Sequence, residues 1–406
     1  SMRLPDNNGN WKKHADEPRL MVRREPGEEG GEYYSLMNEG KLYHLKGDIY
    51  QHAPPKEGLD LNRNFPNWVP EGKQVGAGDA PLSEPETRAM TDFIVSHKNI
   101  SIAVYGHTFS GVLLRPSASA ADTELPTGDL RMYKLMGRKG EAITGYPALS
   151  TFHDYRYDPK SVILGTENWF YETLGIVSWT VEYWAPHRQA GVEVSDYIGW
   201  FNEHPVEDDL KMLHWSDTVL AGKGYIDWYA FDHPVLGQVE LGGWEWLQSI
   251  NNPPDHLIEK EIAPVIDWVL WLAALSPCLE LYRAGAEALG DDIYRIEFVV
   301  ENTGYMPTYG MERAVEGKVT REVMAEIQLP KGSSLIQGKV RENLGHLSGR
   351  NDVPATSFFN DGVTVVGGRA QRAIVEWIVK APKGTEIKLI AKQPRSGVVR
   401  ALVCCK

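Results

Sequence analysis

Three short segments of the chain carry side chains that together can bind a carboxylate and activate water. Asn62 and Arg63 are adjacent in residues 59–65, His107 follows an apolar run, and Glu182 follows another. An arginine offers a planar pair of donors that matches a carboxylate, and asparagine adds a neutral donor. A carboxylate at the end of an apolar strand must be paired, bind a metal or have a raised pKa. A carboxyl group with a pKa near neutrality suits general-base work on water.

Each of these residues also has a purely structural interpretation. Arg63 can close a surface loop, and a histidine at a strand end is often a hydrogen-bonded structural residue. Glu182 can form a buried salt bridge with an arginine such as Arg115. Two tyrosines, Tyr155 and Tyr157, lie in a polar loop, where a tyrosine either donates a proton into a cleft or covers the loop.

The elements around these residues alternate between helix and strand. The sequence Ser-Glu-Pro-Glu at residues 83–86 reads as a capping box and predicts a helix that buries Met90, Phe93 and Ile94. Residues 100–105 predict a buried strand that stops at Gly106-His107. Helices are predicted at 131–144 and 169–174, and a buried strand at 176–181. This order predicts an α/β fold with a mostly parallel mixed sheet and flanking helices. Ligands of such sheets bind at the carboxyl ends of the strands.

The two ends of the chain differ from this middle part. Residues 1–58 are rich in glycine, proline and charge, and predict long surface loops with short strand-like pieces such as residues 20–22. A helix is predicted at 256–276, kinked at Pro264. Beyond it the apolar residues alternate with polar ones, which predicts an all-β sandwich. The expected units are therefore 1–277 and 278–406.

Composition excludes some classes of function. A formal net charge of −13 over 406 residues argues against nucleic acid as a partner. The most apolar stretch, residues 265–279, is too short and too polar to span a bilayer, and the first residues show no targeting segment. Three cysteines, two of them adjacent, cannot make a disulfide framework, which favours a reducing compartment such as the cytoplasm without fixing one. The oligomeric state stays open.

Taken in this order, the segments resemble the M14 family of zinc carboxypeptidases. The shared pattern is an Asn-Arg pair, a Ser-Glu-Pro-Glu helix start, a histidine followed by serine or threonine, and a late glutamate on a strand. His107 and Glu182 are 75 residues apart, close to the usual gap in the family. The resemblance covers roughly residues 59–190 and is greatest to a long bacterial branch with a C-terminal β-sandwich.

The resemblance implies a role for each matching residue. His107 would be a zinc ligand, with one Zn²⁺ per complete catalytic domain, and Glu182 would be the general base. Asn62 and Arg63 would hold the free C-terminal carboxylate of a peptide substrate, from which the enzyme releases the last amino acid.

The family also implies a mobile tyrosine, a pocket floor and an arginine that stabilises the oxyanion. The tyrosine would be Tyr157, or Tyr155 if the loop aligns differently. Glu167 and Asn168 would form the floor of the side-chain pocket, where an acidic Glu167 favours polar or basic C-terminal residues. For the oxyanion role the nearest matches are the residues Lys12 and Arg19.

One part of the family pattern is missing. Its first two zinc ligands form a His-x-x-Glu motif well before the Asn-Arg pair. The string at His14 to Glu17 lies only 48 residues before Asn62, in a charged loop after Trp11, and we interpret it as chance. We therefore expect the N-terminal part of the catalytic domain to be missing, zinc binding to be weak or absent, and this chain alone to be inactive on peptides.

Two further functions stay open at this point. The first is a non-catalytic relative whose cleft binds carboxylate termini and whose β-sandwich binds a partner or a glycan. The second is deacylation of an N-acyl amino acid, although the Ser-Glu-Pro-Glu helix and the tyrosine loop resemble the peptidases more closely.

Overall fold

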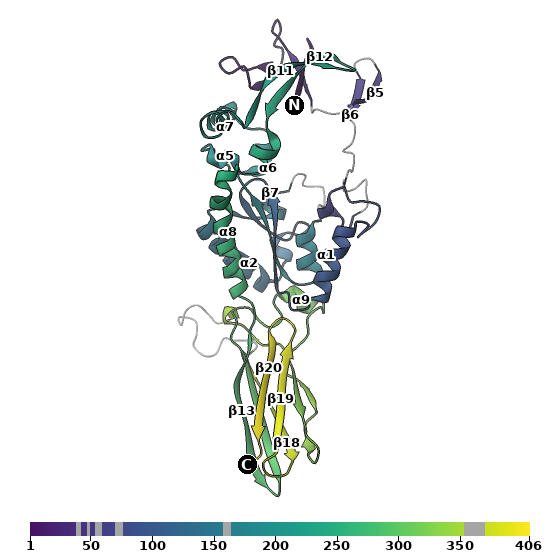
Figure 1. Ribbon diagram of the computed structural model, residues 1–406, viewed down its shortest axis with the longest axis vertical. Helices are drawn as coiled ribbons and strands as arrows, with labels where there is room; N and C mark the ends of the chain where they lie inside the picture. The colour runs from purple at the N-terminus through teal and green to yellow at the C-terminus, as the bar shows by residue number, and fades with distance from the viewer. Residues whose placement is uncertain (38–41, 47–48, 53–58, 70–75, 157–163, 353–369) are drawn as a thin grey trace.

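A four-stranded mixed sheet lies at the centre of an elongated molecule (Figure 1). The computed structural model describes residues 1–37, 42–46, 49–52, 59–69, 76–156, 164–352 and 370–406. The sheet has the order β7 (Ile102–Thr108), β10 (Val177–Tyr183), β8 (Val112–Arg115), β9 (Ala148–Ser150). The pairs β7–β10 and β8–β9 are parallel and β10–β8 is antiparallel. The predicted α/β fold is confirmed, with a sheet that is mixed.

Strand β7 differs from its prediction in two ways. It runs through His107 to Thr108 and does not stop at Gly106. It is also an edge strand, with every residue at least partly exposed, and is not a buried strand. Its register with β10 places His107 directly opposite Glu182.

The side chains of β10 point alternately to the two faces of the sheet, and this alternation decides on which face the functional site lies. Val177, Trp179 and Val181 pack into the largest core of this region. This core includes residues of α2 (Thr127–Thr144) and α8 (Asp255–Ala274), which contains Pro264. Because successive side chains of a strand point to opposite faces, Glu182 lies on the other face. There a second cluster contains Trp169 and Phe170.

The helix predicted after Ser83 is present as α1 (Pro85–Ser96), but its cap and its buried face were predicted wrongly. Glu84 is the N-cap and makes no capping hydrogen bond through its side chain, whereas the Ser83 hydroxyl donates to the Glu84 carboxylate. Met90 and Phe93 are exposed, and Ile94 is only partly buried.

The face of α1 that is buried is polar. Thr87 and Thr91 are its buried residues, and the Thr87 hydroxyl donates to the Asn64 side-chain oxygen at 2.8 Å. The Asn64 amide in turn donates to the carbonyls of Ala77 and Ala80. Hydrogen bonds to the loop at Asn64 therefore set the rotation of α1, and apolar periodicity does not reveal them.

Residues 1–37, predicted as loops with strand-like pieces such as residues 20–22, contain that strand but belong to a sheet that was not predicted. They form β1 (Met2–Pro5), β2 (Trp11–Lys13), β3 (Met21–Arg23) and β4 (Tyr34–Met37). These strands join β11 (Tyr225–His233) and β12 (Gly237–Trp244) in an antiparallel sheet of order β11-β12-β1-β4-β2-β3. These strands are too short for an alternation of apolar and polar residues to be recognised. The strand β12, with which β1 pairs, is distant in the sequence. A separate hairpin is formed by β5 (Leu42–Lys46) and β6 (Ile49–His52).

The remaining helical segments are mostly short. They are η1 (Leu61–Arg63), η2 (Asp122–Glu124), α3 (Thr151–Asp154), α4 (Thr166–Asn168), η3 (Trp169–Thr173), α5 (Pro186–Gln189), α6 (Tyr197–Asn202), α7 (Val206–Val219), η4 (Trp246–Ile250), α9 (Glu312–Glu316) and η5 (Arg350–Asp352). Within the parts of the chain that the structure describes, every helix is too short or too polar to cross a bilayer.

Two antiparallel sheets form the C-terminal part, as predicted. One contains β13 (Leu279–Gly290), β14 (Ile293–Asn302), β18 (Arg372–Lys380) and β16 (Ser334–Gln337). The other contains β17 (Arg341–Asn343), β15 (Met324–Gln328), β19 (Glu386–Gln393) and β20 (Gly397–Cys404).

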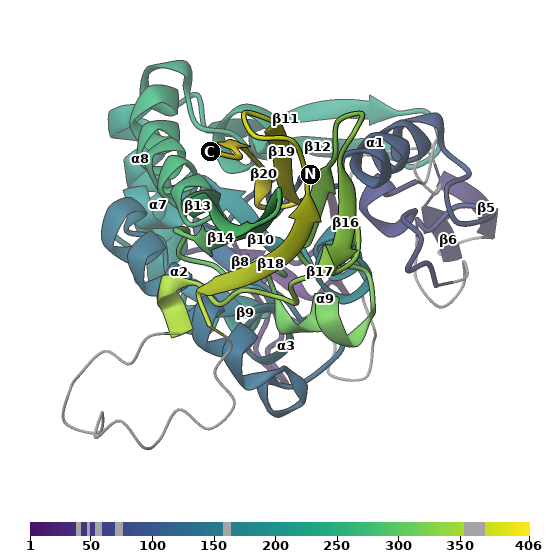
Figure 2. The same cartoon turned by 90° about the horizontal axis from the view of Figure 1, so that it is seen from below.

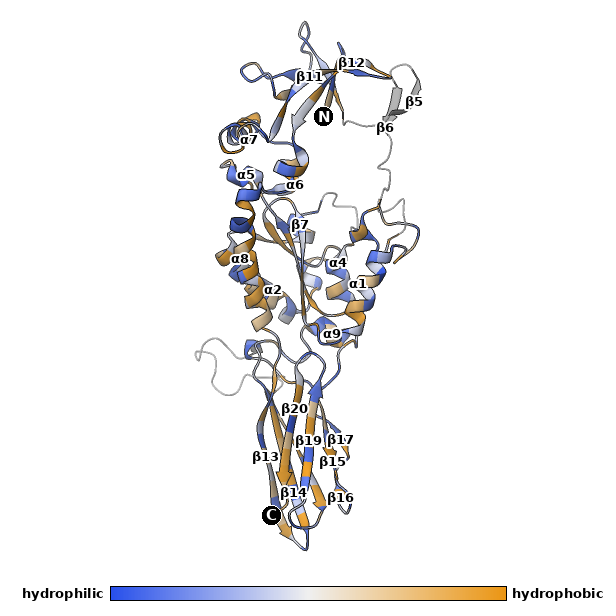
Figure 3. Cartoon of the chain, in the orientation of Figure 1, coloured by the Kyte–Doolittle hydropathy of each residue, from blue (hydrophilic) through white to orange (hydrophobic). Residues whose placement is uncertain are grey.

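The predicted alternation in this part is confirmed. Residues Ile296, Phe298 and Trp377 of one sheet and Ile387 and Leu389 of the other share one buried core. The view from below shows the strands of this part gathered beneath the central sheet (Figure 2), and apolar residues run along them (Figure 3). The division at residue 277 stays a prediction; α8 ends at Ala274 and β13 begins at Leu279.

Arg395 joins the C-terminal sheets to the central part. It lies between β19 and β20, and its guanidinium donates to the carbonyls of Leu174 (2.6 Å), Gly175 (2.8 Å) and Tyr309 (2.7 Å). The first two carbonyls follow the helical segment that ends at Thr173, where a cation is favourable. Burial lowers the pKa of Arg395 to about 10, which still leaves it charged at neutral pH.

We expect Arg395→Met to lower the free energy of unfolding by about 2–4 kcal/mol, because three carbonyls lose a charged donor. Urea unfolding followed by tryptophan fluorescence measures this change. The matched control is Arg400→Met, at an exposed position of β20, for which we expect a change within about 0.5 kcal/mol. Equal effects of the two substitutions would contradict the role of Arg395.

Candidate functional site

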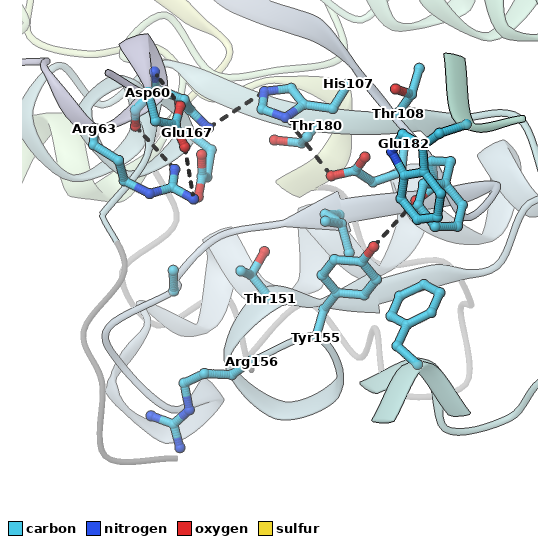
Figure 4. A pocket seen from close by; sticks show the side chains of 16 residues that line it. Asp60, Arg63, His107, Thr108, Thr151, Tyr155, Arg156, Glu167, Thr180 and Glu182 are labelled. Carbon is cyan, nitrogen blue, oxygen red and sulfur yellow. Dashed lines mark hydrogen bonds and ion pairs between the residues drawn. The ribbon is translucent and has the colours of Figure 1, made fainter. Parts of the chain in front are cut away.

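A cavity of about 440 Å³ opens beside the carboxyl ends of β7 and β10 (Figure 4). The side chains of Arg63, His107 and Glu182 all line it, so the groups that the sequence singled out converge on one cleft. The complete lining is Asp60, Asn62, Arg63, His107, Thr108, Phe109, Leu114, Ala118, Thr151, Tyr155, Arg156, Glu167, Thr180, Glu182, Phe201 and Trp246.

His107 and Glu182 face each other across the two strands. The His107 Nδ1 atom lies 3.9 Å from the Glu182 Oε1 atom, as their places in the register require. Burial lowers the pKa of His107, Asp60 raises it and Arg63 lowers it further. The imidazole is therefore mainly neutral at pH 7, the form that can bind a metal or accept a hydrogen bond.

The loop at residues 60–63 holds the Asn-Arg pair in a fixed geometry. The Asp60 carboxylate accepts a hydrogen bond from the Asn62 backbone at 3.0 Å and lies 3.5 Å from the Arg63 guanidinium. The Asn62 side-chain oxygen accepts from the backbone and the hydroxyl of Thr166, at 2.8 and 2.6 Å. With its oxygen bound in this way, Asn62 turns its amide nitrogen toward His107, 3.5 Å from Nε2. The Asn62 amide is thus held as a donor at the cleft.

Glu182 is the residue whose pKa is changed most clearly in the cleft. Burial raises its pKa to about 8, Glu167 raises it further, and Arg63 acts in the opposite direction. Burial also raises the pKa of Glu167, which is almost fully inaccessible. The salt-bridge alternative for Glu182 does not apply, because Arg115 pairs with Asp122 at 2.8 Å. Glu182 is a carboxyl group that titrates near neutrality, as general-base chemistry requires.

Of the two residues predicted for the pocket floor, one lines the cleft and the other does not. Glu167 lines the cleft. Asn168 does not, and its amide donates to Glu172 at 3.2 Å and to Ser117 at 3.4 Å. Glu167 and Asn168 are consecutive residues of α4 and point in different directions.

The two candidate tyrosines have different outcomes. Tyr157 lies outside the described residues. Tyr155 lines the cleft but is buried, and its hydroxyl lies 2.9 Å from the Ser110 hydroxyl and donates to the Phe109 carbonyl at 3.4 Å. A side chain held at its hydroxyl end in this way does not suit a mobile cap.

The candidates near the N-terminus do not line the cleft. Lys12 pairs with Glu28 at 2.8 Å, and Arg19 pairs with Glu17 and Asp217. The His14 Nδ1 atom accepts a hydrogen bond from the Glu17 backbone at 3.1 Å. These contacts support the interpretation of this His-x-x-Glu string as chance.

Sequence reasoning missed several lining residues. Asp60 stands next to the Asn-Arg pair, and a capping aspartate before a short helix is a local signal that can be found. Thr166 holds Asn62 across 104 residues of sequence. Phe109, Phe201 and Trp246 belong to no motif, and only the fold brings them to the cleft.

The described residues do not fit a catalytic zinc ion. Such an ion takes three protein ligands and keeps one position open. Among the residues that the structure describes, no group of three or more His, Cys, Asp or Glu side chains is arranged to hold a metal. His107 offers one imidazole, and its two ring nitrogens face the Asn62 amide and the Glu182 carboxyl group.

Comparison with known protein families assigns the segment that contains most of this cleft. Residues 32–198 match the family model described as zinc carboxypeptidase, and residues 278–403 match a domain of unknown function (DUF8731). Residues 32–198 are thus similar to a zinc carboxypeptidase domain of the M14 family. The resemblance seen in the motifs is confirmed.

Individual known proteins are similar to parts of this chain. Mast cell carboxypeptidase A from Homo sapiens is 37% identical over 108 residues, which are 25% of this chain and 24% of that protein, and the Mus musculus protein gives the same values. The chain thus spans about a quarter of the length of the curated relatives it matches. A thrombin-activatable fibrinolysis inhibitor structure is 27% identical, with 31% of this chain and 35% of that chain covered and a TM-score of 0.26. Carboxypeptidase A from Helicoverpa armigera is 18% identical over 45% of this chain and 44% of that chain, with a TM-score of 0.25.

The electrostatic arrangement predicts how the pKa of Glu182 responds to its neighbours. A nearby negative charge raises the pKa of an acid, so Glu167→Gln lowers the pKa of Glu182 from about 8. Removing a nearby positive charge has the opposite effect, so Arg63→Met raises the pKa of Glu182. The measurement is carbon-13 NMR of glutamate carboxyl groups, with Glu182→Gln to assign the signal. The exposed Glu86→Gln is the control, and an identical shift in this control would contradict the argument.

Proposed function

We propose that the cleft binds the free C-terminal carboxylate of a peptide through Arg63 and Asn62. The observation that carries this proposal is the convergence of Arg63, Asn62, His107 and Glu182 on one cavity of about 440 Å³. This volume falls within the range of small-ligand sites and suits the last residues of a peptide. The match of residues 32–198 to the zinc carboxypeptidase family model supports a peptide as the ligand.

The chemistry of carboxylate binding follows from the way the donors are held. The Arg63 side chain is 19% exposed and is oriented by Asp60 and by the Asn62 carbonyl, to which its Nη1 atom donates at 3.2 Å. A partly buried guanidinium forms strong paired hydrogen bonds with a carboxylate. The Asn62 amide adds a donor that needs no reorganisation, because Thr166 already fixes its orientation.

The reaction proposed for the complete protein is release of the C-terminal amino acid by hydrolysis. Glu182 would take the proton of the attacking water and pass it to the leaving amine, and its pKa of about 8 suits this role. Zinc would supply Lewis-acid activation of that water in this family. Since no three of the described His, Cys, Asp or Glu side chains are arranged to hold such an ion, we expect this chain alone to bind peptides without cleaving them.

A non-catalytic carboxylate-binding protein is the second candidate. The observation in its favour is the incomplete ligand set among the described residues, together with an intact Asn-Arg pair. Glu182 favours the hydrolase, because a buried carboxyl group of raised pKa gives no advantage to a site that binds an anion.

The side-chain preference follows from Glu167. Its carboxyl group lines the same cleft as Arg63, which is the principal cation acting on it. A lysine or arginine at the C-terminus of the peptide would compensate the acidic groups, so we propose basic C-terminal residues as preferred ligands.

We expect Arg63→Met to weaken binding of a peptide that ends in lysine by about ten- to a hundredfold, because charge-assisted hydrogen bonds to the carboxylate are lost. Isothermal titration calorimetry measures this. The same peptide with an amidated C-terminus should bind weakly to both proteins. Arg138→Met, at an exposed position of α2, is the matched control and should leave affinity unchanged. Equal affinity for the acid and the amide would refute carboxylate recognition.

A second prediction concerns zinc and turnover. The chain with one equivalent of Zn²⁺ should release no amino acid from this peptide above the rate of a His107→Ala variant, because one imidazole binds zinc too weakly. Amino-acid analysis measures release, and equilibrium dialysis measures bound zinc. Tight stoichiometric zinc with turnover would show that residues outside the described ranges complete the site.

A further inference from the structure

A second cavity, of about 410 Å³, lies where the central part of the molecule meets the C-terminal strands (Figure 1), and we call it the junction cavity. Four cationic side chains line it: Lys98 after α1, Lys318 and Arg321 between α9 and β15, and Arg395 between β19 and β20. Among the described residues that line it, none is an aspartate or a glutamate. Because the whole chain has a net charge of −13, this gathering of positive charge runs against its average composition.

Arg395 is the least exposed of the four cations and has no acidic partner. Its guanidinium donates to three carbonyl groups. Burial is the only influence that shifts its pKa, so within the part of the chain that the structure describes no carboxylate neutralises it. A charge withdrawn from water is normally paired. An anion in the junction cavity would supply the missing counter-charge.

The end of α1 does not account for the charge of Lys98. The Phe93 carbonyl accepts hydrogen bonds from the His97 backbone at 3.1 Å and from the Ser96 hydroxyl at 2.8 Å. The Ile94 carbonyl also accepts from the His97 backbone, at 3.2 Å. These carbonyls of the last turn therefore have donors without Lys98, and the ammonium group of Lys98 is available to a ligand.

The turn after α9 does not account for Lys318 either. The backbone of Lys318 is left-handed, with a φ of 54°, and its N–H donates to the Val315 carbonyl at 3.1 Å. Glycine and asparagine adopt this conformation at the lowest cost. The turn would therefore be formed more easily without a lysine, and this lysine lines the junction cavity.

The other part of the lining is aliphatic. Four side chains of the apolar cluster that includes Trp169 reach the junction cavity, namely Ile94, Ile100, Leu174 and Ile176. Val319, next to Lys318 in the chain, also lines it and is 45% exposed. An apolar group on the ligand would remove these side chains from water. The cationic and aliphatic parts together suit one small ligand that has an anionic group and an apolar group, and the volume is in the range of such sites.

A neighbouring cavity of about 850 Å³ shares Lys318 and Arg321 with the junction cavity but has a mixed charge. Glu322 also lines it, and its Arg341 is paired with Glu326 at 2.9 Å. Since part of its positive charge is already compensated, the junction cavity is the stronger site for an anion.

We propose that the junction cavity binds a small organic phosphate ester. Its phosphate would lie among the four cations and its apolar group would lie on the aliphatic side chains. A phosphate monoester carries a charge of about −1.5 to −2 at pH 7 and three acceptor oxygens, which match several cations better than a carboxylate does. The site is independent of the proposed function, because none of the described residues that line this cavity lines the peptide cleft.

The test uses phenyl phosphate as the probe and isothermal titration calorimetry at low ionic strength, since salt screens exposed charges. We expect the full chain to bind phenyl phosphate about tenfold more tightly than inorganic phosphate, from burial of the ring. Benzoate, with one charge, should bind more weakly than phenyl phosphate. Lys98→Gln and Lys318→Asn should each weaken phenyl phosphate about three- to tenfold. Asparagine suits the left-handed backbone, so Lys318→Asn preserves the turn.

Lys392→Gln is the matched control. Lys392 is exposed and lines the neighbouring cavity but not the junction cavity, so the affinity for phenyl phosphate should not change. Arg63→Met removes the cation of the peptide cleft and should also leave this affinity unchanged. Circular dichroism checks that each variant is folded.

Each contrary result is distinct. A loss of affinity in Lys392→Gln without one in Lys98→Gln would place the anion in the neighbouring cavity, and a loss in Arg63→Met would place it in the peptide cleft; either overturns the proposal. Equal affinity for phenyl phosphate and inorganic phosphate, or no binding of phenyl phosphate, overturns it too. Sedimentation with vesicles of phosphatidylcholine and phosphatidic acid, without binding of phenyl phosphate, would identify a lipid surface as the ligand instead.

Discussion

The parallel pairing of β10 with β7 is the constraint on which the site depends. Its register sets His107 opposite Glu182, and the alternation of β10 sends Trp179 into the core while Glu182 faces the cleft. A shift of one residue would exchange these faces and place the carboxyl group among tryptophans. The apolar side chains of β10 pack against α2 and α8 and thereby stabilise this register. The same register turns Glu182 toward the cleft.

Burial gives the cleft its electrostatic character. Arg63 is placed among Asp60, Glu167 and Glu182, and it opposes the rise in pKa of both glutamates. In a partly desolvated cavity these charges interact more strongly than they would in water. A carboxylate ligand would therefore enter next to the Arg63 guanidinium and next to Glu182, whose pKa burial raises.

The sequence predicts this centre well because its residues occur in ordered local motifs. The helix after residue 84, the strand before Glu182 and the alternating C-terminal strands all follow from periodicity and turn residues. The same reasoning fails for residues 1–37, whose short strands are defined by pairing with β12. It also fails for the rotation of α1, where Thr87 binds Asn64, and for Trp246 and Phe201. These features depend on contacts between distant segments, which a single sequence does not contain.

Arg395 links the shape of the cleft to a part of the molecule that does not line it. Its guanidinium holds the carbonyls of Leu174 and Gly175, and β10 begins only two residues later, at Val177. The start of the strand that carries Glu182 is thus anchored from the turn between β19 and β20. Displacement of this turn would remove those hydrogen bonds beside the first residues of β10, at the end of the strand opposite to Glu182.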